Sequence, residues 1–414
     1  MRTACIIVLL AGFAFPLRAG TQIPETGARS ECIVPIRAVT SGKAHWFGYY
    51  DKEQFDPSGR YLLAMQVGFE DRTPNPDDAI QLGMVDLEDG DHWIPLGESR
   101  AWSWQQGCML QWLPGSDSEV IYNDRDGEAF VSYIQDVFSG ERRKLPRAIY
   151  CVSPDGKWGL SVNFARIQDT RPGYGYHGGV DPLAEQFAPE GDGIWRMNLE
   201  TGESELLFSY AQAAAIPQEA KPAGKHWFNH LLYNMDGSRY TFLHRVHNEP
   251  GSTARTTRMF TADANGGNLH VVADHGMVSH FIWRDPEHIL AWSREPDIGD
   301  RFILYRDQSD AMTVIGDGVL ARDGHCTYSP DRKWILSDTY PDKNKMQHLY
   351  LYRVSDGKRV DLGQFYRPKP SENEWRCDLH PAWSRDGRTI AIDSMHEGDT
   401  RQVYVLDVSE YTAP

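Results

Sequence analysis

The sequence lacks an excess of positive charge. It has 58 Asp and Glu residues against 42 Lys and Arg residues, which gives a formal net charge of −16. Nucleic-acid binding requires clustered Lys and Arg to neutralise phosphates, so nucleic acid is excluded as the expected partner. After the first residues there is also no apolar run long enough to span a bilayer, so we expect no membrane span.

Cysteine is scarce, and its spacing excludes a disulfide framework. Beyond residue 19 only Cys32, Cys108, Cys151, Cys326 and Cys377 remain, an odd and widely spaced set. The simplest interpretation is that they are small apolar core residues. Cys326 and Cys377 lie on neighbouring repeats, however, and a disulfide or a pair of metal ligands stays open for them.

The one strongly apolar stretch, at the N-terminus, has the pattern of a secretory signal. Arg2 supplies a positive start, residues 5–15 are apolar, and Leu17-Arg18-Ala19 ends in a small residue suited to cleavage. We therefore predict a signal peptide at 1–19, a secreted or periplasmic location, and one monomeric domain over residues 20–414.

A cassette of strand, polar turn and strand recurs through the rest of the chain. Its clearest copy is 324–336, where Ser329-Pro330-Asp331 forms the turn: Pro presets φ and Asp bonds its own backbone. The other copies lie at 55–61, 112–115, 150–158, 233–240, 283–288 and 380–392. Each is followed by a further strand pair, so each repeat has four strands, the content of one propeller blade.

Seven such repeats predict an all-β fold, a seven-bladed β-propeller. The last repeat is short of its outermost strand, and residues 32–39 read as a strand without a blade of its own. We expect this N-terminal strand to close the ring and remove two open edges. An insertion at about 166–193, rich in Gly and aromatic residues, is predicted to be a loop over the mouth of the channel.

Four consecutive repeats carry histidine at one register of the innermost strand. These residues are His230, His280, His325 and His380, each three residues before an aromatic residue. Innermost strands line the central channel, so one register means one height along the axis, and the imidazoles are expected to converge. Asp378 lies two residues before His380, on the same face of a strand. Several His with a carboxylate suit a divalent ion such as Mn, Zn or Ca.

Further candidates surround this register. His226 and His230 are an even number of residues apart on one predicted strand, so both are expected to face the channel. Arg245 ends the next strand near the same rim. The candidates for substrate contact are aromatic, imidazole and amide side chains near the channel mouth, namely His45, Tyr49, Gln106, Tyr174, Tyr176 and His177.

The histidine-bearing repeats resemble a known family. The runs His226-Trp227, 242–245, 258–269, 279–283 and 378–381 resemble the seven-bladed propeller polysaccharide lyases, with oligogalacturonate lyase as the nearest type and ulvan lyases as more distant relatives. In that family, channel histidines hold a metal ion that binds the uronate carboxylate, and a His and an Arg perform the elimination. The resemblance therefore implies a lyase acting on uronic-acid-containing saccharides.

The resemblance also implies roles for single residues. His280 and His380 match metal-binding histidines, whereas Asp378 stands where the family usually has His. Either His226 or His230 matches the base. The family's Arg lies upstream of its base, whereas Arg245 lies downstream of both histidines. Arg245 is therefore a candidate because of its place near the channel rim and not because of the resemblance. We assign His280, His325, His380 and Asp378 to the ion.

Two other functions remain open at this point. A rhamnosidase-like propeller glycoside hydrolase needs paired carboxylates in the channel, and only Asp51 and Asp378 suggest themselves. A non-catalytic, TolB-like periplasmic binding propeller is compatible with the fold, because fold alone does not decide function.

Overall fold

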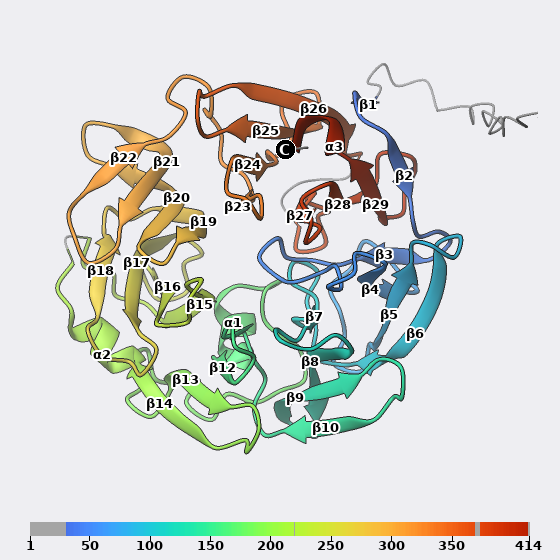
Figure 1. The fold of residues 1–414 in the computed structure, drawn as a ribbon. Coiled ribbons are helices and arrows are strands. Elements are labelled where there is room, and N and C mark those ends of the chain that lie inside the picture. Colours follow the sequence, from blue (N-terminus) through green and yellow to red (C-terminus); the bar gives the residue numbers. More distant parts are fainter. Residues whose placement is uncertain (1–29, 219, 369–372, 413–414) are drawn as a thin grey trace, which may run out of the picture.

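The chain forms a ring of seven antiparallel sheets around a central axis (Figure 1). The structure, a computed structural model, describes residues 30–218, 220–368 and 373–412. The predicted signal at 1–19 lies outside the described residues. No helix in the described ranges is long and apolar enough to cross a membrane. The prediction of a seven-bladed, all-β propeller is confirmed.

The first three blades follow the predicted order of strands from the channel outward. Blade 1 consists of β3 (Ala44–Trp46), β4 (Tyr61–Val67), β5 (Ile80–Asp86) and β6 (His92–Ser99). Blade 2 consists of β7 (Gln111–Trp112), β8 (Glu119–Asp126), β9 (Ala129–Asp136) and β10 (Arg142–Leu145). Blade 3 consists of β11 (Cys151–Val152), β12 (Trp158–Ser161), β13 (Gly193–Asn198) and β14 (Ser204–Ser209).

Blades 4 and 5 have the longest inner strands. Blade 4 consists of β15 (His226–Tyr233), β16 (Arg239–His247), β17 (Arg255–Asp263) and β18 (His270–Ala273). Blade 5 consists of β19 (Val278–Asp285), β20 (His288–Glu295), β21 (Gly299–Arg306) and β22 (Met312–Val314). Three short helices complete the elements: α1 (Phe164–Thr170), α2 (Tyr210–Ala215) and α3 (Ser409–Thr412).

The N-terminal segment joins the last two blades. Blade 6 consists of β23 (Cys326–Tyr328), β24 (Trp334–Ser337), β25 (Met346–Arg353) and β26 (Arg359–Tyr366), with β1 (Glu31–Cys32) added at its outer edge. Blade 7 consists of β27 (Ala382–Trp383), β28 (Thr389–Ser394) and β29 (Gln402–Asp407), with β2 (Ile36–Ala38) as its fourth strand. Ring closure by an N-terminal strand is therefore observed, and the segment pairs with two blades rather than one.

The turn between the two inner strands explains why the cassette repeats. In blades 3, 6 and 7 a Ser hydroxyl donates to the Asp two residues later, for example Ser329 to Asp331 at 2.7 Å. The same Ser oxygen accepts the N–H of the first residue of the next strand, Trp334, at 3.0 Å. The motif therefore closes its own hairpin before any contact with another blade forms.

Polar side chains also join one blade to the next near the channel. Asn123 bonds both backbone groups of Ile149, Asp338 accepts the N–H of His380, and Asp393 accepts the N–H groups of Phe47 and Gly48. In each case the bonded backbone group belongs to the following blade, at its innermost segment. These bonds satisfy buried backbone groups where the inner strands are short, and they hold the channel-lining segments in place.

The insertion after the second strand of blade 3 differs in part from the prediction. It begins with α1 and not with a loop: Asn163 caps the helix by accepting the N–H of Arg166. Phe164 and Ile167 face the core on the helical spacing of three. From Arg171 onward the segment has no helix or strand up to β13, as expected.

Candidate active site

The imidazole rings of the shared register converge in the channel. The ring centroids of His280 and His325 are 4.2 Å apart, and those of His325 and His380 are 4.3 Å apart. His230 joins this group through Tyr49, whose ring stacks on His230 at 5.2 Å and lies 5.3 Å from His380. Four blades and one aromatic residue of blade 1 therefore form one continuous cluster.

The backbone of β15 separates the two histidines that were expected to face the channel together. The register of β15 shifts between Asn229 and Leu232, and His230 lies in this bulge with a φ of 53°. The period of two does not carry across a bulge, so His226 faces elsewhere. Its Nδ1 lies 2.9 Å from Nε2 of His244, and burial lowers the pKa of His226 to about 4. The prediction that His226 and His230 both face the channel was therefore wrong.

Two carboxylates orient the central histidines. Nδ1 of His325 lies 2.9 Å from Oδ2 of Asp338, and Nδ1 of His280 lies 2.9 Å from Oδ1 of Asp323. Each carboxylate accepts the Nδ1 proton, which leaves Nε2 of the same ring with a free lone pair. Burial alone would lower the pKa of His325, but Asp338 raises it above its usual value.

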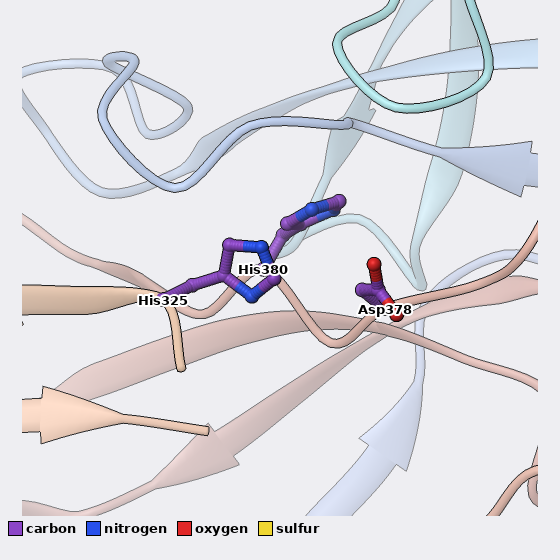
Figure 2. Close-up of side chains that lie close together, drawn as sticks. All are labelled: His325, Asp378 and His380. Carbon is purple, nitrogen blue, oxygen red and sulfur yellow. The ribbon is translucent and has the colours of Figure 1, made fainter. Parts of the chain in front are cut away.

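Three residues have the composition and spacing of a metal centre. The ligand atoms of His325, Asp378 and His380 all lie within 4.8 Å of one another (Figure 2). Nε2 of His325 and Nε2 of His380 are buried and have no hydrogen-bond partner among the described residues. Two orphaned imidazole nitrogens beside a carboxylate fit a divalent ion, because a buried acceptor without a partner otherwise costs free energy. His280 is not part of this group of three.

Asp378 is held by two arginines. Arg367 Nη1 donates to one carboxylate oxygen and Arg376 Nε to the other, both at 2.7 Å. Burial would raise the pKa of the Asp378 carboxyl, but Arg376 and Arg367 outweigh it and the pKa is lowered. Asp378 is therefore a permanent anion, a state that suits a metal ligand and not a proton donor.

A cavity of about 510 Å³ opens beside the histidines. Its charged and aromatic walls come from blades 4, 5 and 6 and the insertion, and consist of Arg171, His230, Arg245, Arg255, His280, Asp323 and Tyr340. Arg245 is only 3% exposed, and its Nε and Nη1 have no partner among the described residues. Burial, with Arg171 and Arg255 nearby, lowers the pKa of Arg245. An arginine stays charged in proteins, so this cavity holds uncompensated positive charge and favours an anionic ligand.

The insertion covers this end of the channel. Its Gly173 carbonyl accepts the N–H of Gln105 in blade 2, and Arg376 before blade 7 donates to the Tyr174 hydroxyl at 2.7 Å. The Tyr174 ring lies 5.9 Å from His230, with the Arg171 guanidinium 4.2 Å from the same tyrosine ring. Arg376 and Arg171 lower the pKa of Tyr174 to about 7 against the opposite effect of burial.

None of the six residues predicted for substrate contact is among the residues that line the cavity. Tyr176 stacks on Phe164 at 4.2 Å and packs in the core. His45 is bonded to Gln66 and to the Lys43 carbonyl on blade 1. His177 is half-buried. The Gln106 side chain accepts a hydrogen bond from the Tyr150 hydroxyl. Tyr49 and Tyr174 lie against the histidine cluster.

Several site residues were not found from the sequence. They are the carboxylates Asp323 and Asp338, the arginines Arg171 and Arg255, and Tyr340, whose ring lies 6.0 Å from that of His280. One signal was available: an Asp follows the register histidine by thirteen residues in blade 6 (Asp338) and in blade 7 (Asp393). Pairing the two inner strands places both at the channel end.

The cysteines take no part in the site. All five cysteines in the described ranges are free, and Cys326 and Cys377 are buried. Burial raises the pKa of the Cys377 thiol to about 12, which opposes a thiolate ligand. The structure therefore gives no disulfide among the described cysteines and favours buried, uncharged thiols at Cys326 and Cys377.

Comparisons with known proteins give a likeness in fold. No family model matches the chain, and no curated protein matches it. Among solved structures, oligogalacturonate lyase from Vibrio parahaemolyticus has a TM-score of 0.63 at 16% identity, covering 92% of this chain and 99% of that chain. The chain is similar in fold to oligogalacturonate lyase.

Two further structures bear on this likeness. An oligogalacturonate lyase in complex with manganese has a TM-score of 0.61 at 17% identity and covers 92% of this chain and 95% of that one. Prolyl endopeptidases have a TM-score of 0.52 at 10% identity, with 87% of this chain and 47% of that chain covered. The propeller is therefore shared with enzymes of different chemistry, and nothing among these structures supports the ulvan lyase part of the resemblance.

Proposed function

We propose that the protein is an exported polysaccharide lyase that cleaves uronic-acid-containing poly- or oligosaccharides by β-elimination. The observation that carries this proposal is the cavity beside the histidine cluster, which combines uncompensated arginines with oriented imidazoles. Elimination removes the proton α to a carboxylate and expels the sugar linked at the next carbon. A site for it needs cations for the carboxylate and a neutral base for the proton.

His325, Asp378 and His380 would hold a divalent ion in this site. Imidazole with carboxylate suits manganese or zinc better than calcium, which prefers oxygen ligands throughout. The bound ion would neutralise the uronate carboxylate and so acidify the neighbouring C–H bond. Manganese is supported by the similar fold of the oligogalacturonate lyase that was solved with this metal.

The arginines supply the rest of the positive charge. Arg245, buried and with two guanidinium nitrogens unpartnered, is placed to bind the carboxylate or the enolate-like charge that develops on it. Arg171 and Arg255 line the same cavity. Preorganised cations of this kind stabilise developing negative charge without reorganisation during the reaction.

The base is one of the two histidines that line the cavity, and the geometry favours His280. Asp323 accepts from its Nδ1, which leaves Nε2 as the proton acceptor and opposes the lowering of the pKa of His280 by burial. Burial lowers the pKa of His230 well below its usual value, and the nearby Arg245 and Arg171 lower it further, which makes His230 a weaker base. His226, bonded to His244, does not line the cavity.

The two rival functions fit the site less well. A hydrolase needs a carboxylic acid with a raised pKa, but Asp378 is paired with two arginines and Asp51 with Lys52. A protein that only binds an anion would use the unpartnered arginines but would not need imidazoles oriented by carboxylates, and fold alone does not exclude it.

Turnover of a small set of uronate oligosaccharides, followed by the ultraviolet absorbance of the new C–C double bond, tests the proposal. We expect product with at least one of them, and a loss of at least about 100-fold in kcat for His280→Gln, the size usual for a missing general base. His92→Gln, an exposed histidine on β6, is the matched control and should retain full activity. No product with any uronate, or full activity in both His280→Gln and His230→Gln, would contradict the proposal.

A further inference from the structure

A second cavity lies beside the first and shares two of its walls. It measures about 410 Å³ and is lined by Arg322, Asp323, Tyr340, Pro341, Asp342 and Lys343. Asp323 and Tyr340 belong to both cavities. Because each volume is in the range of roughly 300–1,000 Å³ usual for ligand sites, the pair is large enough for an extended ligand.

The second cavity has two carboxylates and two cations, and only the carboxylates already have partners in the protein. Asp323 is bonded to His280, and Asp342 accepts the N–H groups of Asn344 and Met346 and lies 3.3 Å from Nε2 of His348. Both carboxylates are therefore already engaged within the protein. Arg322 and Lys343, in contrast, are exposed and form no ion pair with any residue in the described ranges. The two cations are therefore the charged groups of the cavity that are available to a ligand.

Tyr340 stands between the two cavities. It follows β24, is half-buried, and its ring lies 5.9 Å from that of His325. An aromatic ring offers an apolar face to the C–H face of a sugar, and the flanking cations then reach its acidic groups. A ring with a cation on each side of it in one cavity suits a saccharide that carries acidic groups better than a single small anion, which has no use for the ring.

We propose that Arg322, Lys343 and Tyr340 form a second saccharide subsite, which binds a further anionic sugar of the chain whose neighbour occupies the first cavity. This inference deepens the proposed function and rests on it for the identity of the ligand as a uronate oligosaccharide. The protein accordingly prefers oligomers that reach across Tyr340 to shorter ones, and the preference weakens with salt, since the two cations are exposed to solvent.

A charge-neutralising double variant tests the subsite. Arg322→Gln with Lys343→Gln removes both cations, and Arg332→Gln with Lys333→Gln makes the same change at the turn between β23 and β24. That turn lies at the opposite end of these strands from Asp323 and Tyr340, so the second double variant is a matched control. The assay measures kcat/KM for uronate oligomers of increasing length.

We expect kcat/KM of the wild type to rise with length, and the Arg322/Lys343 variant to lose roughly tenfold on the longer oligomers, the effect of two lost contacts between solvent-exposed charges. Tyr340→Leu should lower the same values while Tyr340→Phe retains them. Equal kcat/KM in wild type and the Arg322/Lys343 variant at every length overturns the subsite, as does an equal loss in the control variant.

Failure of the subsite and failure of the proposed function are distinguishable. If the wild type forms no product with any uronate oligomer, the lyase proposal fails, and calorimetric titration with the same oligomers then measures binding directly. Tighter binding of longer oligomers that disappears in the Arg322/Lys343 variant supports the subsite without turnover. Binding that is absent, or that is unchanged in this variant, overturns it.

Discussion

At the scale of single residues, buried arginines divide into two kinds. Arg166 is fully buried and donates to the carbonyls of His226, Gln186 and Phe187 and to Asp181. Arg245 is almost as buried, but two of its nitrogens have no partner among the described residues. The first kind supports the fold, whereas the second carries a desolvation cost that no protein partner among the described residues offsets and that an anionic ligand would offset.

This contrast predicts opposite effects of the same substitution. Arg245→Met should leave the free energy of unfolding unchanged or raise it by about 1 kcal/mol, because it removes an uncompensated buried charge. It should also lower kcat/KM on a uronate by roughly 100-fold or more, as loss of a charge-stabilising donor does. Denaturant unfolding and the lyase assay measure the two effects.

Arg166→Met is the matched control for this prediction. Breaking a buried, fully bonded charge network costs about 3–5 kcal/mol, so this variant should unfold much more easily. Similar destabilisation of both variants would show that Arg245 is a structural residue and would remove it from the proposed site.

At the scale of elements, Asp338 links two blades and two histidines. It accepts the N–H of His325 and of His380 and also bonds His325 Nδ1. Asp393 occupies the same place one blade later, but it accepts from Phe47 and Gly48, and no hydrogen bond or ion pair joins it to a histidine in the described ranges. The two residues share a structural role, and only Asp338 orients a candidate ligand.

Asp338→Asn and Asp393→Asn separate these roles. Both should lower the free energy of unfolding by about 2–3 kcal/mol, because each leaves a buried N–H group without an acceptor. Only Asp338→Asn should also weaken manganese or zinc binding, by roughly 10–100-fold, the usual effect of losing the partner of a ligand histidine. Equal metal affinity in both variants, measured by titration with the metal, would contradict the assignment.

Elements also show where reasoning from the sequence failed. The expectation that His226 and His230 face one way rests on an unbroken strand, and the bulge at His230 breaks it. The backbone of His230 has a φ of 53° and that of His380 a φ of 43°, an uncommon conformation for a residue other than Gly. Bulges and positive φ values depend on packing against the next blade, which the pattern of one strand does not contain.

At the scale of the whole molecule, buried neutral histidines determine the response to acid. Burial lowers the pKa of His226 and His396 to about 4, and it lowers the pKa of His230 and His244 well below the usual value. The folded chain therefore binds fewer protons at these sites than the unfolded chain, whose histidines titrate near about 6.5. Asp393, with a pKa raised to about 7 by burial, and His325, with a pKa raised by Asp338, act in the opposite direction but are fewer than the histidines with a lowered pKa.

We therefore expect the free energy of unfolding to fall as the pH decreases from about 6.5 to about 4, the window between the unfolded and folded pKa values of these histidines. Urea unfolding at several pH values measures this. His396 packs against Phe365 and Tyr404, so His396→Phe should keep the packing and reduce the loss. Stability that is flat or greatest near pH 4 would show that these histidines are not neutral in the folded protein.

The sequence alone determined the ring of blades. Each cassette carries its own turn, such as Ser329 to Asp331, and alternating strands, so seven copies specify seven sheets without reference to the final structure. It also determined that four histidines share one register. Both properties are local and repeat along the chain, so they can be recognised directly in the sequence.

Only the tertiary structure decided which residues complete the site. Asp323 and Asp338 reach His280 and His325 from 43 and 13 residues away, and Arg171 reaches the cavity from an insertion in another blade. The structure also turned His226 away from the channel and left His280 outside the group of three ligands. Closing the ring brings distant segments together at the axis, and contacts of that kind leave no periodic trace in the sequence.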